Sequence, residues 1–526
     1  MEKITTDIST FEKLRKNGFV YVDKTDFLWR LVAMRDGCQF FISRPRRFGK
    51  SLMLSTLKAI FEGKRELFRG LKIERKRYDW KKYPVVMLDM SKVKGETPEE
   101  LKTALNAVVD GIAAKFRLKA ARGGPVGTRF GMTLDALFEK HGEYVVLVDE
   151  YDVPLQGFFG DRAALVRVRK LMHDFYINLK NREADIRFLM LTGVTKLTKV
   201  SVFSGLNHLT DLTMERREYA ALLGYTPKEI AENFPHRLDM LAKRMRSDRK
   251  GALKQLLDWY DSYRFSPEST ARVCNPISIG KALAARSIQN YWAKTASASL
   301  VMERIAASGK TPDDFEGCTA TVDELDVCDA LSLPVKALMY QGGYLTIKRV
   351  VGEANGVDEQ KLILGVPNQE VRTAIRAGWF NSIVKVPATE FDALVDVAKR
   401  QVAAGDVRAL VGETLYRVYA KIPPEWKIRS EADVKRHFRL FMEMLGAKIA
   451  AEEGSAFGYA DAIIETRKFV WVFEFKFNKS ANAAIRQIRE KGYADPYRGD
   501  RRPVTLVGVS FRTAKRNIDE PVFNSL

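Results

Sequence analysis

The chain has 526 residues, of which 46% are hydrophobic and 29% charged, so it is too long for one hydrophobic core and predicts several domains. Its apolar runs are shorter than the ~18 residues of a membrane span. Its start lacks the apolar core of a signal peptide, and its four cysteines lack the spacing of a zinc site or a disulfide framework. We therefore expect a cytoplasmic protein that does not associate with membranes. The formal net charge of +21 favours nucleic acid as a partner over the alternative of a surface kept basic for solubility.

The first predicted elements lead into and out of a short loop at residues 43–51. They are a helix around Phe11 and Leu14, a strand over 19–22, a helix over 27–34, an apolar strand over 39–42 and, after the loop, an apolar helix over 52–61. The loop ends in Gly49, Lys50 and Ser51. Such a loop between strand and helix is typical of nucleotide binding. Backbone N–H groups up to that of Leu52 face the phosphates, the lysine adds a charge, and the hydroxyl ligates Mg²⁺.

The loop departs from the general phosphate-binding pattern at one position. That pattern is G-x-x-x-x-G-K-[ST], and this chain has Arg44 in place of the first glycine. Arg46 and Arg47 stand in the same loop, and the planar guanidinium group suits phosphate oxygens. We expect the three arginines to bind the nucleotide phosphates or a nucleic-acid backbone nearby. Exposed loop charges that improve solubility are the alternative.

Further apolar strands alternate with helices up to residue 193. The strands are predicted over 84–90, 144–148 and 186–191, and the helices over 97–116, 134–139 and 163–179. Apolar strands that alternate with helices of this length are typical of a parallel sheet covered on both faces.

Polar residues stand where the predicted strands end. Asp149 and Glu150 follow one strand and Thr192 follows another. Ligands of open α/β sheets bind outside the carboxyl ends of the strands, so we expect these residues to lie beside Lys50 and Ser51. The sequence predicts a site for ATP and Mg²⁺, with Asp149 and the serine as metal ligands and Glu150 as the residue that orients and deprotonates the attacking water. An acidic turn after a core strand is the alternative.

The middle of the chain is predicted to be mostly helical. Helices are expected over 219–223, 228–233, 237–245, 254–263 and 278–286, then a small α+β element over 320–350, a loop or hairpin over 352–360, and more helices over much of 368–418. This pattern differs from the alternation before it and indicates a separate region.

The last predicted unit, about 427–526, reads helix, hairpin, helix, strand. Its hairpin joins strands over 458–466 and 469–477, which can bring Asp461 beside Glu474 and Lys476. Two carboxylates can hold Mg²⁺ or Mn²⁺, the metal can activate water, and the lysine can orient the nucleophile. A cross-strand ion pair on a solvent face is the alternative.

The chain resembles the AAA-ATPase-like proteins fused to a PD-(D/E)XK nuclease-like domain. The resemblance rests on residues 21–25, 44–51, 148–154, 191–195, 201–211 and Asn275-Pro276, and it covers nearly the whole chain. It implies an α/β fold made of a P-loop (AAA-like) parallel sheet with flanking helices, a helical middle region and a C-terminal α/β nuclease-like domain. The expected domains are 1–215 for the ATPase core, 216–350 for a helical lid with a small winged-helix-like region, and 351–526 for the nuclease-like domain with its catalytic core at about 427–515.

The resemblance also implies roles for particular residues. Thr192 stands where ATPases of the AAA type have a polar residue that senses the γ-phosphate, and Glu431 stands where the first helix of the nuclease fold can complete the metal site. Gln487 is a further candidate site residue. Tyr459 replaces an arginine that family members often have, which is expected to alter substrate contact and leave the metal ligands in place.

These observations favour a protein that binds and hydrolyses ATP and cleaves nucleic acid through a metal-dependent domain. One alternative keeps the ATPase and makes the C-terminal domain an inactive nucleic-acid-binding module. Another is a nucleotide-gated protein-interaction switch without nucleic acid. DNA or RNA, strandedness, assembly into a homo-oligomer and the presence of an arginine finger stay open.

Overall fold

The computed structural model describes the chain apart from residues 1, 34–36, 197–208, 293–298, 309, 327–333, 353–359, 385–387, 423–427, 446–448, 451–453 and 456–457. The chain forms two compact units. Residues 1–296 and 314–372 make the first unit, and residues 297–313 and 373–526 make the second. The boundaries predicted after residues 215 and 350 stay predictions.

The first unit contains a five-stranded parallel sheet, as the alternating pattern predicts. Its strands are β1 (Gln39–Ser43), β2 (Val85–Asp89), β3 (Tyr144–Asp149), β4 (Ile186–Gly193) and β5 (Thr210–Asp211), in the order β2-β3-β4-β1-β5. Because the pairs are parallel, the ends of β1, β3 and β4 meet at one edge of the sheet. The predicted α/β fold is confirmed.

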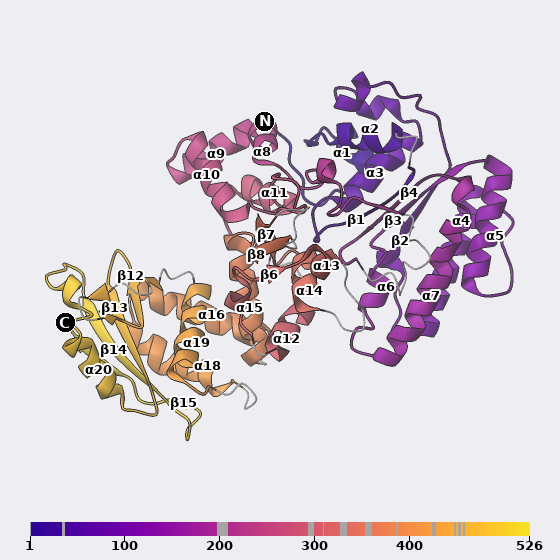
Figure 1. Ribbon diagram of the computed structural model, residues 1–526. Coiled ribbons are helices and arrows are strands. Elements are labelled where there is room, and N and C mark those ends of the chain that lie inside the picture. The colour runs from indigo at the N-terminus through magenta and orange to yellow at the C-terminus, as the bar shows by residue number, and fades with distance from the viewer. Residues whose placement is uncertain are drawn as a thin grey trace. The chain divides into compact units, whose positions relative to one another are not determined.

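Helices cover both faces of this sheet (Figure 1). They are α1 (Phe11–Lys16), α2 (Thr25–Ala33), α3 (Lys50–Phe61), α4 (Pro98–Phe116), α5 (Val126–His141), α6 (Val153–Gln156) and α7 (Arg162–Lys180). Neighbouring residues of β1 show the two faces: Phe40 stacks near Phe188, which packs on Phe61 of α3, while Phe41 joins the core beneath α4, α5 and α7. Strands buried on both faces explain the continuous apolar runs.

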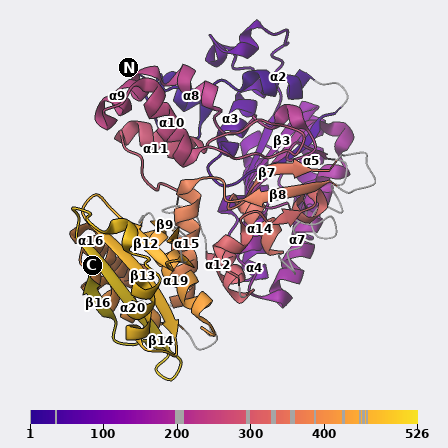
Figure 2. The ribbon, with the colours of Figure 1, turned by 60° about the vertical axis from the view of Figure 1, so that its left-hand side comes forward.

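The rest of the first unit is a helical group and a small sheet. The helices are α8 (Pro227–Asn233), α9 (Pro235–Met245), α10 (Arg249–Tyr260) and α11 (Pro276–Ala285), and the sheet joins β6 (Thr319–Ala320), β8 (Lys361–Gly365) and β7 (Thr346–Val351). Figure 2 shows β7 and β8 beside α14 (Val335–Gly342), which follows α13 (Val322–Asp326). β7 pairs antiparallel with β8, while residues 353–359 of the loop or hairpin predicted over 352–360 lie outside the described residues.

The second unit is built on a mixed sheet between helices. The sheet has the order β15-β14-β13-β12-β9, with β16 also paired to β14, and its strands are β9 (Ile449–Ala450), β12 (Ala462–Glu465), β13 (Val470–Phe477), β14 (Val504–Arg512), β15 (Asn517–Ile518) and β16 (Val522–Ser525). Phe438 of α19 (Glu431–Met444) packs on Phe473, and Ile485 of α20 (Ala481–Glu490) shares a core with Val472. Successive residues of β13 therefore face opposite helices.

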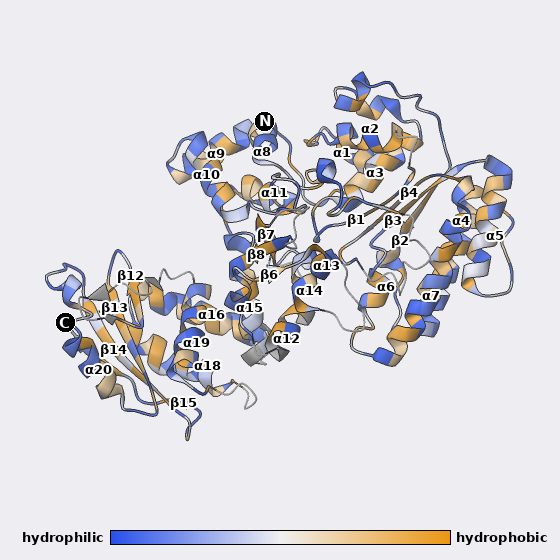
Figure 3. Ribbon diagram, viewed as in Figure 1, coloured by the Kyte–Doolittle hydropathy of each residue, from blue (hydrophilic) through white to orange (hydrophobic). Residues whose placement is uncertain are grey.

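The remaining helices of this part of the chain come from two separated segments. They are α12 (Ser299–Ala307), α15 (Gln369–Val384), α16 (Ala388–Ala404), α17 (Val407–Ala409) and α18 (Tyr416–Ala420). Trp379 Nε1 donates to Lys310 O (3.0 Å), and Arg376 pairs with Asp313 (2.9 Å). These bonds join the two segments of the second unit, because Lys310 and Asp313 belong to one segment and Trp379 and Arg376 to the other. Figure 3 shows apolar strands in this unit and in the first.

Some sequence-based expectations about elements are wrong. Residues 19–22 form no ladder; Val20 N donates to Lys3 O (2.9 Å), and the extended segment lies outside the sheets. Residues 219–223 are not a helix, because a 3-10 turn at Arg217–Tyr219 is followed by turns. Residues 201–208 of one family motif lie outside the described residues. Among the described helices, none is long and apolar enough to cross a bilayer.

We predict opposite stability effects at two helical glycines. A Cβ on Gly127 of α5 would lie 2.3 Å from Asp174 O of α7, whereas a Cβ on Gly111 of α4 would meet no atom within 4 Å. Gly127→Ala should destabilise by about 1–3 kcal/mol through overpacking. Gly111→Ala should be neutral or stabilise by up to about 1 kcal/mol through helix propensity. Thermal denaturation of the full chain measures both, and equal effects would contradict this account of the α5–α7 contact.

A second prediction concerns buried Glu370. Its oxygens accept from Tyr291 N (2.7 Å), Trp292 N (2.8 Å) and Ser278 Oγ (2.8 Å), and burial raises its pKa to about 7 against these hydrogen bonds. A raised folded-state pKa means that stability present below the ordinary value of 4.5 is lost as pH rises through about 7. Relative to Glu370→Gln, the wild type should lose roughly 3 kcal/mol across that window. A stability difference between the two proteins that is independent of pH would contradict the prediction.

Candidate functional site

The loop between β1 and α3 is shaped by a left-handed glycine. Gly49 has φ 96° and caps α3, whose first residues are Lys50 and Ser51. Glycine adopts this conformation without the steric cost that a Cβ would bring. The first N–H groups of a helix lack partners within the helix and carry its positive dipole end. The turn therefore presents an anion-binding helix start at the edge where the strands end.

Lys50 lies inside its own loop. Its side chain is 5% exposed, and Nζ donates to Arg44 O (2.7 Å) and Pro45 O (3.0 Å). Burial lowers its pKa to about 8, against the nearby charges of Asp152 and Asp149. Two backbone carbonyls of the loop that follows β1 therefore hold the ammonium group of Lys50.

The predicted residues at the ends of β3 and β4 lie together. Thr192 Oγ1 donates to Asp149 Oδ1 (2.7 Å), and both side chains are buried. Glu150 has φ 52°, a conformation that costs a non-glycine residue energy and is common at functional sites. Burial, and next the charge of Asp149, raise the pKa of Glu150. The charges of Asp149 and Glu150 act on Lys50, and Thr192 is hydrogen-bonded to the first of these two carboxylates.

Asp152 is a residue of this site that the sequence reasoning missed. It is fully buried, and its carboxylate accepts from Thr195 N (2.9 Å), Val194 N (3.3 Å) and Gln156 Nε2 (3.0 Å). It therefore fastens the turn after β3 to the end of β4. Its position in the family motif 148–154 is the one sequence signal that points to it.

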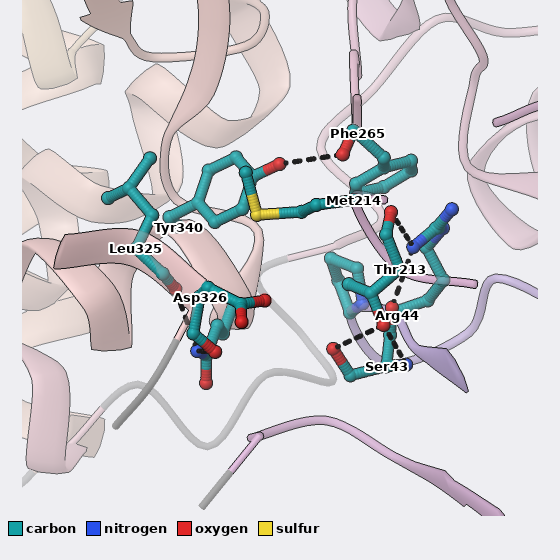
Figure 4. Close-up of a pocket in the computed structure, with 10 residues that line it drawn as sticks. Ser43, Arg44, Thr213, Met214, Phe265, Leu325, Asp326 and Tyr340 are labelled. Atoms are coloured by element: carbon teal, nitrogen blue, oxygen red, sulfur yellow. Dashed lines mark hydrogen bonds between the residues drawn. The ribbon is translucent and has the colours of Figure 1, made fainter. Parts of the chain in front are cut away.

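The three loop arginines lie in different surroundings. Arg44 is 1% exposed, its guanidinium group lies 4.2 Å from the ring centre of Phe265, and Nη1 donates to Ser43 O (2.9 Å) and Thr213 O (3.0 Å) (Figure 4). Arg46 Nη2 donates to Gln156 Oε1 (3.2 Å), and Arg47 is exposed. Phosphate binding by these arginines stays a prediction. The described bonds of Arg44 make its side chain a buried support of the loop.

A largely apolar pocket adjoins the loop between β1 and α3. Its lining includes Tyr21, Phe48, Gly49, Leu52, Leu222 and Tyr225. Lys24, also at this pocket, is paired with Glu229 (2.7 Å). The sequence reasoning assigned Gly49 and Leu52 but not the other residues of this lining, although the family motif 21–25 contributes to it. The pocket offers an aromatic and aliphatic wall directly beside the glycine turn.

The second unit gathers three carboxylates, which come from the start of α19, the residue before β12 and the interior of β13. Oxygen atoms of Glu431, Asp461 and Glu474 all lie within 4.8 Å of one another. Asp461 Oδ2 also accepts from Phe475 N (2.8 Å), and Glu474 is 1% exposed. The alternative of an ion pair on a solvent face is therefore wrong for Glu474.

Lys476 compensates only part of this negative charge. Its Nζ donates to Glu474 Oε1 (3.0 Å) and Phe475 O (2.9 Å) and lies 3.5 Å from Glu431 Oε1. Glu474 Oε2 is buried and has no hydrogen-bond partner among the described residues. Burial, and next the charge of Asp461, raise the pKa of Glu474 to about 7. A buried carboxylate oxygen without a donor is costly, so this donor set suits a bound divalent cation.

Lys435 is a second lysine of the cluster that the sequence reasoning missed. Its Nζ lies 2.5 Å from Asp461 Oδ1 and 3.2 Å from Glu431 Oε1. The spacing of four residues between Glu431 and Lys435 places both on one face of α19 and is the signal that could have found it.

Two other predicted residues lie differently. Gln487 of α20 donates from Nε2 to Tyr493 Oη (3.4 Å), and no contact among the described residues joins it to the carboxylates. Tyr459, at the end of β11 (Gly458–Tyr459), is 60% exposed. The cluster of three carboxylates is present with tyrosine at this position, and an altered substrate contact stays a prediction.

Comparisons with known proteins agree with this arrangement. Residues 5–203 match the family model "Predicted AAA-ATPase", and residues 429–521 match the model of the PD-(D/E)XK nuclease superfamily. The chain is 32% identical over 548 residues to an "Uncharacterized protein in vnfD 5'region" of Azotobacter chroococcum mcd 1, covering 100% of this chain and 99% of that protein. Among solved structures, Cdc6p from Pyrobaculum aerophilum matches at 13% identity over 70% of this chain and 93% of that one, with a TM-score of 0.21 that carries no argument. The chain therefore belongs to the family of AAA-ATPase-like proteins that also carry a PD-(D/E)XK nuclease-like domain.

Proposed function

We propose that this protein binds and hydrolyses MgATP in its first unit and cleaves phosphodiester bonds of nucleic acid in its second. The observation that carries the proposal is Glu474 Oε2, a buried and unpartnered oxygen among the described residues, beside two other carboxylates and Lys476. The net charge of +21 supports a polyanionic substrate.

The nucleotide site is supported by the loop and the pocket beside it. Phosphate oxygens would bind at the start of α3 and take over Lys50 Nζ from the carbonyls of Arg44 and Pro45. The wall that includes Tyr21 and Tyr225 would hold the base. A mostly apolar pocket with a few polar groups is the usual form of such a site.

The residues after β3 and β4 have the chemistry needed for hydrolysis. Asp149, oriented by Thr192, and the hydroxyl of Ser51 would hold Mg²⁺, which would neutralise charge on the phosphates. Glu150 would orient the attacking water and accept its proton. The raised pKa of Glu150 brings that carboxylate nearer to neutral pH, where a general base is most effective.

The second unit would hydrolyse a phosphodiester. Glu431, Asp461 and Glu474 would hold Mg²⁺ or Mn²⁺, which would lower the pKa of a bound water and stabilise charge on the phosphate. Asp461 is held in place by Phe475 N, and Lys476 is fixed by Glu474 and a carbonyl. Lys476 would orient the nucleophile. Phe438, which packs on Phe473 and on the ring of Phe475, keeps α19 and therefore Glu431 at the end of β13.

We predict that Glu150→Gln lowers the turnover of ATP by about 10²–10⁴, because a positioned general base contributes that much. ATP binding should be retained, whereas Lys50→Ala should lose it. Lys58→Ala, which removes a lysine of α3 that is paired with Glu62 (3.6 Å), is the matched control and should keep both properties. Filter binding and phosphate release measure the two effects. Undiminished turnover in Glu150→Gln would remove that residue from the mechanism.

We predict that Glu474→Ala abolishes metal-dependent cleavage and that Glu490→Ala, which removes an exposed carboxylate of α20, does not. The assay is a panel of labelled single- and double-stranded DNA and RNA with Mg²⁺ or Mn²⁺, with and without ATP. Lys50→Ala belongs in the same panel, because a response to ATP that is lost in that variant would connect the two activities. Metal-dependent cleavage that survives in Glu474→Ala would contradict the nuclease proposal.

A further inference from the structure

Lys435 contacts two of the three carboxylates that would hold the metal. Its ammonium group lies 2.5 Å from Asp461 Oδ1 and 3.2 Å from Glu431 Oε1, and oxygens of both acids belong to the set within 4.8 Å. An ammonium group and a divalent cation are both attracted to this set of oxygens. Lys435 therefore occupies coordination positions that the metal would need.

The charges of the cluster favour exchange of one cation for another. Three carboxyl groups face two ammonium groups, from Lys435 and Lys476, so with all three acids ionised the described cluster is short of positive charge by about one unit. A divalent cation added to both lysines would reverse that balance and bring like charges within a few ångströms in a partly buried site. Departure of one ammonium group restores the balance.

The exposure of the two lysines decides which one can leave. The side chain of Lys435 is 35% exposed, whereas that of Lys476 is 9% exposed. Lys476 also donates to Phe475 O (2.9 Å), a backbone acceptor that metal binding leaves in place. Lys435 has a flexible side chain and a route to water, so its ammonium group can be released at low cost.

We propose that Lys435 is the resident cation of this cluster and that a divalent metal ion binds by displacing its ammonium group from Asp461 and Glu431. This inference rests on the proposed metal-dependent function and adds a residue that tunes metal affinity. The released ammonium group is then available to a phosphate of the substrate, so that metal binding and substrate binding use the same lysine in turn.

The test is the affinity of the full-length chain for Mn²⁺ without nucleotide, at one fixed pH, with free Mn²⁺ followed by electron paramagnetic resonance. Asp461→Asn removes the charge of one carboxylate of the cluster. The Mn²⁺ that this variant still binds measures binding elsewhere on the chain. Lys435→Met should bind Mn²⁺ about tenfold more tightly than the wild type, because the competing charge is gone. Lys468→Met, which removes an exposed lysine between β12 and β13, is the control and should leave the affinity unchanged.

Thermal denaturation gives a second readout. Without metal, Lys435→Met should melt below the wild type, because three clustered carboxylates then face one lysine. Mn²⁺ should raise its melting temperature more than that of the wild type, since tighter binding stabilises the folded state more at equal metal concentration. Lys435→Gln removes the charge but keeps a polar side chain, and it should behave in the same way if the methionine variant does not fold.

The outcomes separate this inference from the function on which it rests. An Mn²⁺ affinity of Lys435→Met or Lys435→Gln that is weaker than that of the wild type, or within about twofold of it, overturns the displacement of Lys435 and leaves the metal site standing. An equal rise of the Mn²⁺ affinity in Lys468→Met overturns the displacement of Lys435 as well. Equal binding by the wild type and Asp461→Asn overturns both the inference and the metal-dependent function.

Discussion

The first unit depends on a buried carboxylate that joins two strand ends. Asp152 accepts the N–H groups of Val194 and Thr195, and a buried charge of this kind is tolerated only with donors in place. Because β3 and β4 are also parallel neighbours, the bonds of Asp152 set where Asp149 and Thr192 stand at the edge of the sheet. The loop between β1 and α3 follows the strand beside β4, so Lys50 meets acids that are already placed.

Both units bury an ionisable side chain at the candidate site, which costs free energy because the charged group loses its hydration. Lys50 is buried among loop carbonyls with a lowered pKa, and Glu474 is buried with an oxygen that no described donor reaches. Neither arrangement is what stability alone would favour, since an apolar residue in the same place would avoid the desolvation. The acids of the first site stand at the end of β3 or just beyond it, and Glu474 lies within β13; in both units neighbouring side chains of these strands form apolar cores that hold the polar groups in place. The local cost is consistent with sites whose ligands are anionic phosphate and divalent metal.

Local sequence patterns predicted most helices and strands. The contacts between side chains that are distant in the sequence depend on packing and could not be predicted in this way. Continuous apolar runs identified β1, β3 and β4, and alternation in β13 placed Glu474 and Lys476 together before any contact was known. The contact of Lys435 with Asp461 was beyond reach, because it depends on how Phe438 seats α19 on β13. Arg44 shows the same limit: its guanidinium group lies over Phe265, which is far away in the sequence. Residues 19–22 have strand-like composition yet join none of the sheets among the described residues, since strand pairing is not a local property.

The path of the chain has a consequence for how the protein is made. The chain passes between the units at 296/297, 313/314 and 372/373, so neither unit is one continuous stretch. On the ribosome, residues 297–313 emerge before the residues that they contact. Lys310 and Asp313 can form their bonds only after Trp379 and Arg376 have been synthesised. The first unit, in turn, is completed only when β8 and Glu370 have followed. Cutting the gene at any single codon would therefore divide at least one unit.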